Sequence, residues 1–287
     1  MKTILAFPAD THGGSSVGLF PAEHAWQLAD GNQYHASPTQ QLLWRQWREC
    51  WQRVKELRQG GRLIIMHVGD AREGVHHDTT QLVTANLEEQ ERIHIECMEY
   101  ALDLAGFDGA GGDLLYYIAG TEIHVGPAHA GEERIARDLG AIPFRKPTTE
   151  DSNDGRFVWA AKVFTVDEIL FDVAHHGAGL GSRAWTRENG LYQTLKSLYF
   201  MTCEDQNQPP RLWIRAHKHR FLHATYHGRA GSIDGFVLPS FQSVTHYASR
   251  LNIGLSDIGM LTAIVEDGRV RWECDQVEYQ AAKVEVL

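Results

Sequence analysis

Short apolar segments alternate with helical ones through the first two thirds of the sequence, and this alternation limits the fold more than any other feature. Strands are predicted over 3–9, 62–68 and 114–119, and helical stretches over 38–58 and 80–105 lie between them. Apolar residues repeat at three and four positions in the helical stretches and run continuously in the strands. This order predicts a layered α/β domain.

Turn and cap residues set the predicted boundaries. Ser37 followed by Pro38 is typical of a helix start, and Gly60-Gly61 ends that helix after Arg58. Strands predominate in the last third, so we expect the second half of the domain to be built largely from strands. No internal repeat or linker divides the sequence, and we expect one domain over 1–287. The further predicted elements are helices over 131–139 and 186–202 and strands over 157–166, 169–174, 212–215, 221–226, 236–238, 261–266 and 270–274.

The charge balance narrows the function classes. With 27 Lys and Arg against 37 Asp and Glu, the formal net charge is −10. This charge argues against a general nucleic-acid coat protein, because affinity for phosphate backbones comes mainly from basic side chains. It does not exclude a small phosphate ester held by metal ions. The four cysteines are scattered without a C-x-x-C pair, and no apolar stretch approaches the ~18 residues of a membrane span. We expect reduced thiols, a cytoplasmic protein and no membrane partner.

Histidine and aspartate residues gather where predicted strands end. The chain has 16 histidines, and five predicted strands are followed closely by Asp or His. Because ligands bind at the carboxyl ends of strands in open α/β sheets, we expect these side chains to meet at one edge. Nitrogen and oxygen donors without cysteine suit two ions of Mn, Zn, Fe or Ni that share a bridging carboxylate. The residues are Asp10, His12, Asp70, His124, His175, His176, His217 and His219.

Taken in order, these residues resemble the motifs of the calcineurin-like metallophosphoesterases. D-x-H matches Asp10–His12, G-D matches Gly69-Asp70, and H-x-H matches His217–His219, with Gly120 and His175 between them. The segments DTHGGSSVGL and GTEIHVG also look like phosphoesterases encoded by phages and prophages, which would act in the host cytoplasm. The fold that this resemblance implies is a four-layer α/β/β/α sandwich with two mixed sheets.

The resemblance also implies a role for each ligand. Two divalent metal ions would each be held by a set of Asp and His side chains, with Asp70 as the bridge between them. A hydroxide between the ions would attack phosphorus, and His124 would protonate the leaving alkoxide. Manganese is the expected metal, with zinc, iron and nickel as alternatives. The first set would be Asp10, His12 and His219, and the second would be His175 and His217.

The third motif departs from the family pattern. The Asn of G-N-H falls at Thr121 and the His falls at Glu122, and His124 follows two positions later. Either His124 takes the acid role, or Thr121 or Glu122 contacts metal. His175 and His176 are neighbours, so a strand would point them to opposite faces. We expect His175 to be the ligand and His176 to contact another ligand or the substrate.

Four further residues are candidates for substrate binding. His76 and His77 follow the loop of Asp70, and a solvated loop is an equal alternative for both. Arg183 and Arg215 could bind a phosphate oxygen by paired hydrogen bonds, although a surface ion pair is the more common use of an arginine.

The implied reaction is the hydrolysis of a phosphodiester or a phosphomonoester, and we favour the diester. A nuclease of the same fold is the rival within this class. It would act on nucleotides or a strand end, since the charge of −10 weighs against a long duplex. A non-catalytic interaction module on this fold is the rival from another class. Only the third motif is altered, whereas a degenerate module should have lost several ligands. The pattern carries no information on the oligomeric state.

Overall fold

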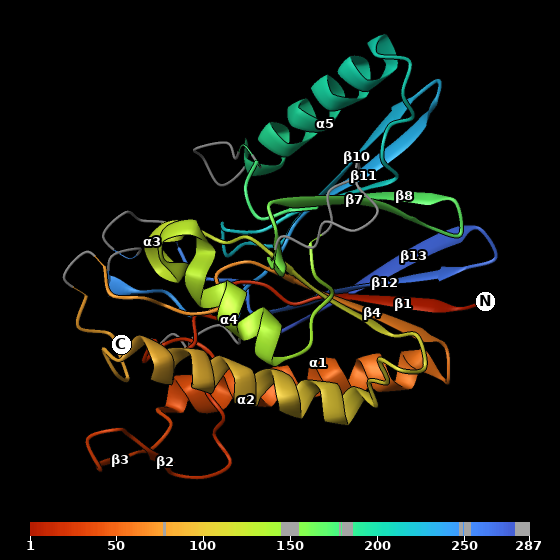
Figure 1. Ribbon diagram of the computed structural model, residues 1–287. Helices are drawn as coiled ribbons and strands as arrows, with labels where there is room; N and C mark the ends of the chain where they lie inside the picture. Colours follow the sequence, from red (N-terminus) through yellow and green to blue (C-terminus); the bar gives the residue numbers. More distant parts are fainter. Residues whose placement is uncertain are drawn as a thin grey trace, which may run out of the picture.

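The structure, a computed structural model, describes residues 1–76, 79–144, 155–177, 179, 186–246, 249 and 254–278. Two β-sheets face each other, and helices cover the outer face of each sheet (Figure 1). One apolar cluster lies between the sheets, and two others lie between a sheet and its helices. The structure thus confirms the four-layer α/β/β/α sandwich with two mixed sheets.

The first sheet has the N-terminal strand β1 near its centre, in the order β13-β12-β1-β4-β5-β6. β1, β4, β5 and β6 run parallel, whereas β12 is antiparallel to both β1 and β13. Every residue of β1 is buried, as expected for a strand covered on both faces. The strands are β1 (Thr3–Phe7), β4 (Arg62–Val68), β5 (Leu114–Ile118), β6 (Val158–Trp159), β12 (Gly259–Glu266) and β13 (Arg269–Gln276).

The second sheet has the order β10-β11-β9-β8-β7. Its central strands β8, β9 and β11 are parallel, and the edge strands β7 and β10 are antiparallel to their neighbours. A separate short ribbon pairs β2 with β3. The strands are β7 (Ala161–Val166), β8 (Ile169–Ala174), β9 (Leu212–Arg215), β10 (Leu222–Gly228), β11 (Gly231–Val237), β2 (Trp26–Gln27) and β3 (Gln33–Tyr34).

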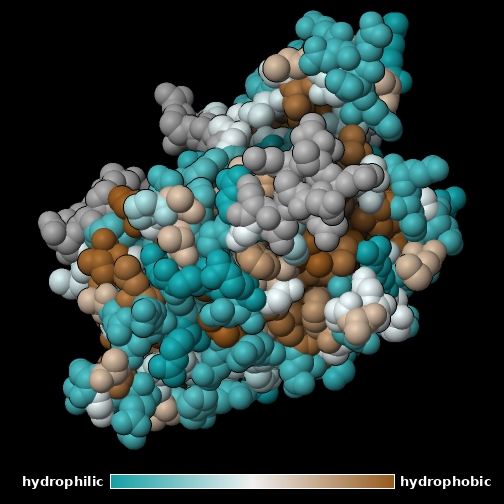
Figure 2. Space-filling model, viewed as in Figure 1, coloured by the Kyte–Doolittle hydropathy of each residue, from teal (hydrophilic) through white to brown (hydrophobic). Residues whose placement is uncertain are grey.

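Helices α1, α2 and α4 pack on the first sheet, and α5 packs on the second (Figure 1). Hydrophilic residues cover most of α5 and of α2 on the face shown in Figure 2. None of the described helices is long and apolar enough to cross a membrane. The helices are α1 (Pro38–Arg58), α2 (Leu87–Ala105), α4 (Ala130–Asp138) and α5 (Arg187–Glu204), with short turns α3 (Glu122–Val125) and η1 (Pro127–His129) after β5.

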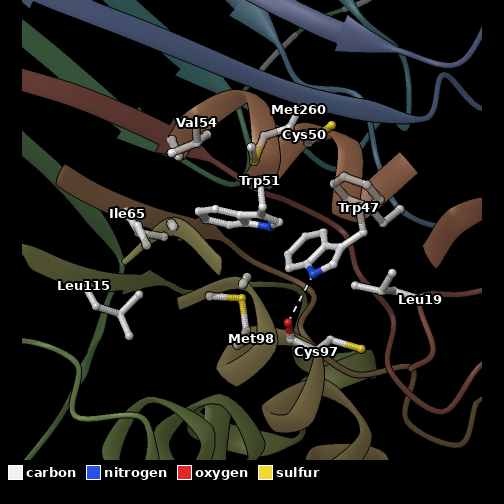
Figure 3. Close-up of a cluster of buried hydrophobic side chains, with 14 of the residues drawn as sticks. Leu19, Trp47, Cys50, Trp51, Val54, Ile65, Cys97, Met98, Leu115 and Met260 are labelled. Carbon is white, nitrogen blue, oxygen red and sulfur yellow. Dashed lines mark hydrogen bonds between the residues drawn. The ribbon is translucent and has the colours of Figure 1, made fainter. Parts of the chain in front are cut away.

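Two tryptophans fasten α1 to α2 beneath the first sheet (Figure 3). Trp47 and Trp51 are fully buried, and their rings meet edge to face with centroids 5.4 Å apart. Trp47 Nε1 donates to Cys97 O at 3.1 Å, which satisfies the indole inside the core. Between the sheets, Phe7 of β1 stacks on Phe171 of β8 with centroids 6.5 Å apart. These contacts pack α1 on α2 and the first sheet on the second.

Some predicted boundaries differ from the structure. The helix expected from residue 80 begins at Leu87, because Asn86 caps it by accepting from the backbone of Glu88 and Glu89. The strand expected over 157–166 breaks at Ala160 into β6 and β7, which belong to different sheets. β8 ends at Ala174 as predicted, so the strand alternation that was expected to point His175 and His176 to opposite faces does not apply to them.

Candidate metal centre

The ends of five strands come together at one place in the molecule. The loops after β1 and β4 are joined by backbone hydrogen bonds from Asp10 N to Gly69 O and from His12 N to Asp70 O, both 3.0 Å. In the second sheet, Ala216 N donates to His175 O at 3.0 Å, which joins the ends of β8 and β9. The six side chains expected to bind metal therefore lie together.

Asp10, His12 and His219 form the first group of donors. Their donor atoms all lie within 4.8 Å of one another, and Asp10 Oδ1 is 3.2 Å from His219 Nε2. Asp10 Oδ1 and His12 Nε2 are buried and make no hydrogen bond within the described residues. Buried polar atoms are almost always paired, so these two facing donors fit a bound cation.

Asp70, His175 and His217 form the second group. Asp70 Oδ2 lies 3.0 Å from His175 Nε2 and 3.9 Å from His217 Nδ1. His175 Nδ1 donates to Val68 O at 2.7 Å, which turns Nε2 toward Asp70. Burial lowers the pKa of His175, but the carboxylates of Asp70 and Asp10 outweigh it and raise the pKa to about 10. Burial likewise raises the pKa of Asp70, yet His175 holds it well below its ordinary value.

Asp70 also connects the two groups. It lies within 4.8 Å of donors from Asp10 and His175, and separately of donors from His12 and His124. A carboxylate placed between two groups of donors could be shared by two metal ions.

The backbone at five of these candidate residues is unusual. Asp10, His12, Asp70, His217 and His219 all have φ between 46° and 71°, in the left-handed region. Non-glycine residues seldom adopt this conformation, although Asp and His do so more often than most. Such strain persists where the surrounding structure enforces it, and it clusters at functional sites.

Two glycines allow the loops to approach this closely. A Cβ at Gly69 would lie 2.4 Å from His175 Nδ1, and one at Gly120 would lie 2.2 Å from Asp70 N. The buried carboxylate of Glu132 accepts from Gly120 N at 2.8 Å and from Ala71 N at 3.3 Å. The turn after β5 is thereby fixed against the turn after β4.

The altered third motif still delivers a histidine to the centre. The ring of His124 meets that of His12 edge to face at 4.7 Å, and its donor atoms lie near those of His12 and Asp70. His124 Nδ1 donates to Glu73 O at 2.8 Å, which leaves Nε2 free to face the site. Burial, together with the nearby His12, lowers the pKa of His124 to about 4. Glu122 instead accepts from Ala128 N at 3.1 Å, on the exposed side of α3.

Arg72 explains how His124 is held two positions later than the motif expects. Its Nε donates to His124 O at 3.2 Å and its NH2 group donates to Val125 O at 3.0 Å. The guanidinium is paired with buried Glu91, which also accepts from Arg134 Nε at 2.8 Å. This network fixes the α3 turn beside the centre.

Glu73 is a site residue that sequence reasoning missed. Its Oε2 lies 2.9 Å from His12 Nδ1 and accepts from Gln242 Nε2 at 2.6 Å, and its Oε1 lies 3.1 Å from His76 Nε2. Burial raises the pKa of Glu73, but the hydrogen bonds from His12 and His76 hold it below its ordinary value. The signal in the sequence was a carboxylate three positions after Asp70 in the same loop. Glu73 orients His12 so that Nε2 faces the site.

A buried polar network lies behind the turn that carries Asp10 and His12. Thr11 Oγ1 is 3.1 Å from His67 Nε2 and 2.9 Å from His94 Nδ1, and His94 Nε2 is 2.9 Å from the hydroxyl of Tyr117. All four side chains are buried. The network ties the turn to β4, α2 and β5.

The remaining candidates have different surroundings. The ring of His76 packs edge to face on His124 at 4.4 Å, beside Glu73. The exposed ring of His176 lies 4.6 Å from those of His175 and His217, with which it forms a further donor group. Arg215 is buried and pairs with Asp172 at 3.0 Å, so we assign it no role in substrate binding. His77 and Arg183 lie outside the described residues.

No family model and no curated protein matches the chain. Among solved structures, a predicted phosphoesterase from Streptococcus pneumoniae aligns over 96% of this chain and 98% of its own, with 9% identity and a TM-score of 0.33. Vps29 from Entamoeba histolytica, complexed with zinc, aligns over 95% and 98%, with 9% identity and a TM-score of 0.34. The sulfate thiohydrolase SoxB from Thermus thermophilus aligns over 96% of this chain but 56% of its own, with 8% identity and a TM-score of 0.43. Similarity this low says nothing about function, which has to be inferred from the geometry of the centre itself.

Proposed function

We propose that this chain is a metal-dependent phosphoesterase with a dinuclear centre. The observation that carries the proposal is the position of Asp70, whose carboxylate is shared by two groups of His and Asp donors. A single ion would not need both groups, and a hydrogen-bonded histidine cluster would not leave His12 Nε2 buried without a hydrogen bond within the described residues.

The donors divide between two ions. Asp70 would bridge them, and the nitrogen and oxygen donors without cysteine suit manganese, which we favour, or zinc, iron or nickel. When bound, two such ions supply a nucleophile at neutral pH and neutralise the charge on the phosphate oxygens. The first ion would be held by Asp10, His12 and His219, and the second by His175 and His217.

His124 would serve as the proton donor to the leaving group. Its Nδ1 is fixed on Glu73 O, so Nε2 is the ring nitrogen that can exchange a proton with the substrate. The negative charge of a bound phosphate beside the ring would favour the imidazolium form over the neutral form that burial favours. A phosphodiester is the substrate class we propose, although such a donor would assist the alkoxide leaving group of either a diester or a monoester. The end of a nucleic-acid strand and a nucleotide diester both belong to this class.

The proposal is tested by removing and restoring metal. Chelator-treated protein should not hydrolyse bis-p-nitrophenyl phosphate, and Mn²⁺ should restore the activity. The ratio of this rate to that with p-nitrophenyl phosphate ranks diester against monoester. Asp70→Asn and His219→Ala should each lower the rate at least about a thousandfold, the upper end of what loss of one transition-state contact costs in other enzymes.

His227→Ala is the matched control, since His227 is exposed on β10 and belongs to none of these donor groups. It should keep the wild-type rate and the wild-type metal content. Full activity in Asp70→Asn and His219→Ala would refute the assigned centre. A wild-type chain that neither binds Mn²⁺ nor hydrolyses either ester would favour a non-catalytic interaction module.

A further inference from the structure

The Thr121 hydroxyl faces the second group of donors. Its Oγ1 lies 3.2 Å from Asp70 Oδ2, 3.4 Å from His175 Nε2 and 3.3 Å from His217 Nδ1. We propose that Thr121 Oγ1 is a ligand of the second metal ion. This inference rests on the proposed function, because it assumes that the centre binds two ions.

The spacing of these four atoms fits a coordination shell. The five measured separations among them run from 3.0 to 3.9 Å. Neighbouring ligands about 2.1 Å from one ion lie about 3.0 Å apart in an octahedral shell and about 3.4 Å apart in a tetrahedral one. The position of Thr121 Oγ1 beside Asp70, His175 and His217 therefore fits that of a further ligand to one ion.

Hydrogen bonding alone accounts poorly for the same arrangement. Hydroxyl hydrogen bonds to oxygen are usually about 2.7–2.8 Å long, shorter than the 3.2 Å found between Thr121 Oγ1 and Asp70 Oδ2. A hydroxyl has one proton to donate, so it can satisfy only one of the three atoms around it. Metal binding requires the neutral form of His175, and because its Nδ1 donates to Val68 O, Nε2 is the nitrogen that would present a lone pair to an ion. Together with Asp70 Oδ2 and Thr121 Oγ1, that nitrogen would offer an ion several lone pairs at one place.

The local backbone also directs the hydroxyl into the centre. Thr121 occupies the N-cap position of α3, where a threonine side chain usually accepts from the backbone of the first turn. Here the side chain makes no capping hydrogen bond. The Thr121 backbone instead donates to Asp70 Oδ1 at 2.6 Å, which holds the residue against the bridging carboxylate. The hydroxyl is therefore not used as a helix cap and is available to the centre.

His176 is the competing donor for this position. Its ring is close to those of His175 and His217, but the side chain is exposed. Coordination by an exposed imidazole would have to overcome the entropy of ordering it, whereas Thr121 is already fixed through its backbone. The geometry favours Thr121, and the two residues can be separated by experiment.

The test is a calorimetric Mn²⁺ titration of the metal-free full-length chain, with metal content measured by mass spectrometry. The wild-type chain should bind two ions. Thr121→Val keeps the shape of the side chain and removes the hydroxyl. It should weaken binding of the second ion at least about tenfold, the low end of the loss of metal affinity seen when a group that supports a metal site is removed. The first ion should bind with unchanged affinity, which also shows that the variant is folded. Thr121→Ser and His176→Ala should keep both ions.

Any other result would overturn the assignment of Thr121 as a ligand of the second ion. If the wild-type chain binds two ions and hydrolyses diesters but Thr121→Val binds both ions equally well, Thr121 is not a ligand and the proposed function stands. If His176→Ala loses the second ion and Thr121→Val does not, His176 is the ligand. If the wild-type chain binds fewer than two ions, both the Thr121 assignment and the dinuclear centre fail.

Discussion

The two halves of the proposed centre share Asp70 but are built differently. Each half has one partly exposed histidine, His219 at 22% in the first and His217 at 33% in the second, beside buried donors. In the first half Glu73 lies behind His12, whereas in the second half the extra donor on our proposal is the neutral hydroxyl of Thr121.

This difference shows how the charge is distributed over the centre. A carboxylate behind a ligating histidine fixes the ring and raises its basicity, whereas a backbone carbonyl fixes the ring with less effect on its charge. His12 has the carboxylate of Glu73, and His175 has the carbonyl of Val68. We therefore expect the first ion to be held more tightly than the second.

The largest effect should come from His124, which packs on the first half. His124→Ala should leave Mn²⁺ binding unchanged and slow hydrolysis of a dinucleoside phosphate about 10²–10⁴-fold, the usual contribution of a general acid or base. Bis-p-nitrophenyl phosphate should be slowed much less, because nitrophenolate leaves without protonation. Rates with the two substrates check this expectation, with His227→Ala as the control. Equal losses with both substrates would mean that His124 does not transfer the proton.

The grouping of the candidate ligands could be predicted because each is a local feature of the sequence. Asp10, Asp70, His175 and His217 each follow a strand within three residues, and the carboxyl ends of neighbouring strands meet at one edge. The four-layer fold followed from the same alternation together with the motif resemblance. This reasoning could find the residues that are recognised from the few sequence positions around them.

The supporting contacts could not be predicted, because they join elements far apart in the chain. Glu73 meets Gln242, which lies 169 positions away, and Arg72 holds the backbone of His124. The break at Ala160 was missed for a similar reason, since an apolar run does not reveal that its two ends enter different sheets. Both histidines after Ala174 reach the centre because the strand ends before them.

A smaller effect is expected from Glu73, whose loss should make the metal affinity of the first half more like that of the second. Glu73→Gln keeps the size of the side chain but removes the charge behind His12. We expect the first ion to bind about 10–100-fold more weakly, as when other groups behind metal ligands are lost, with the second ion little changed. Mn²⁺ titration measures this. Glu122→Gln, at an exposed glutamate in α3, is the matched control and should bind both ions like the wild type. Weaker binding of the second ion in Glu73→Gln would contradict the assignment of Glu73 to the first half of the centre.

The smallest effect concerns the network behind the first half, and it appears as a pH dependence of stability. Burial lowers the pKa of His94 to about 3, whereas an unfolded histidine titrates near 6.5. Between these values the unfolded chain binds the extra proton, so the free energy of unfolding falls as the pH drops. One such histidine contributes a slope of about 1.4 kcal/mol per pH unit.

Other histidines with lowered pKa values, such as His124 and His176, add to the total slope, so the comparison of variants is the informative measurement. His94→Gln keeps hydrogen-bonding groups near Thr11 and Tyr117 but cannot titrate. Urea unfolding of the metal-free chain between pH 6 and pH 5, above the range of most carboxylates, should show a slope smaller by about 1.4 kcal/mol per pH unit in this variant. His35→Gln, at an exposed histidine, should keep the wild-type slope. If the slopes of His94→Gln and wild type agree, His94 is protonated in the folded chain, and the network behind Asp10 and His12 carries a charge.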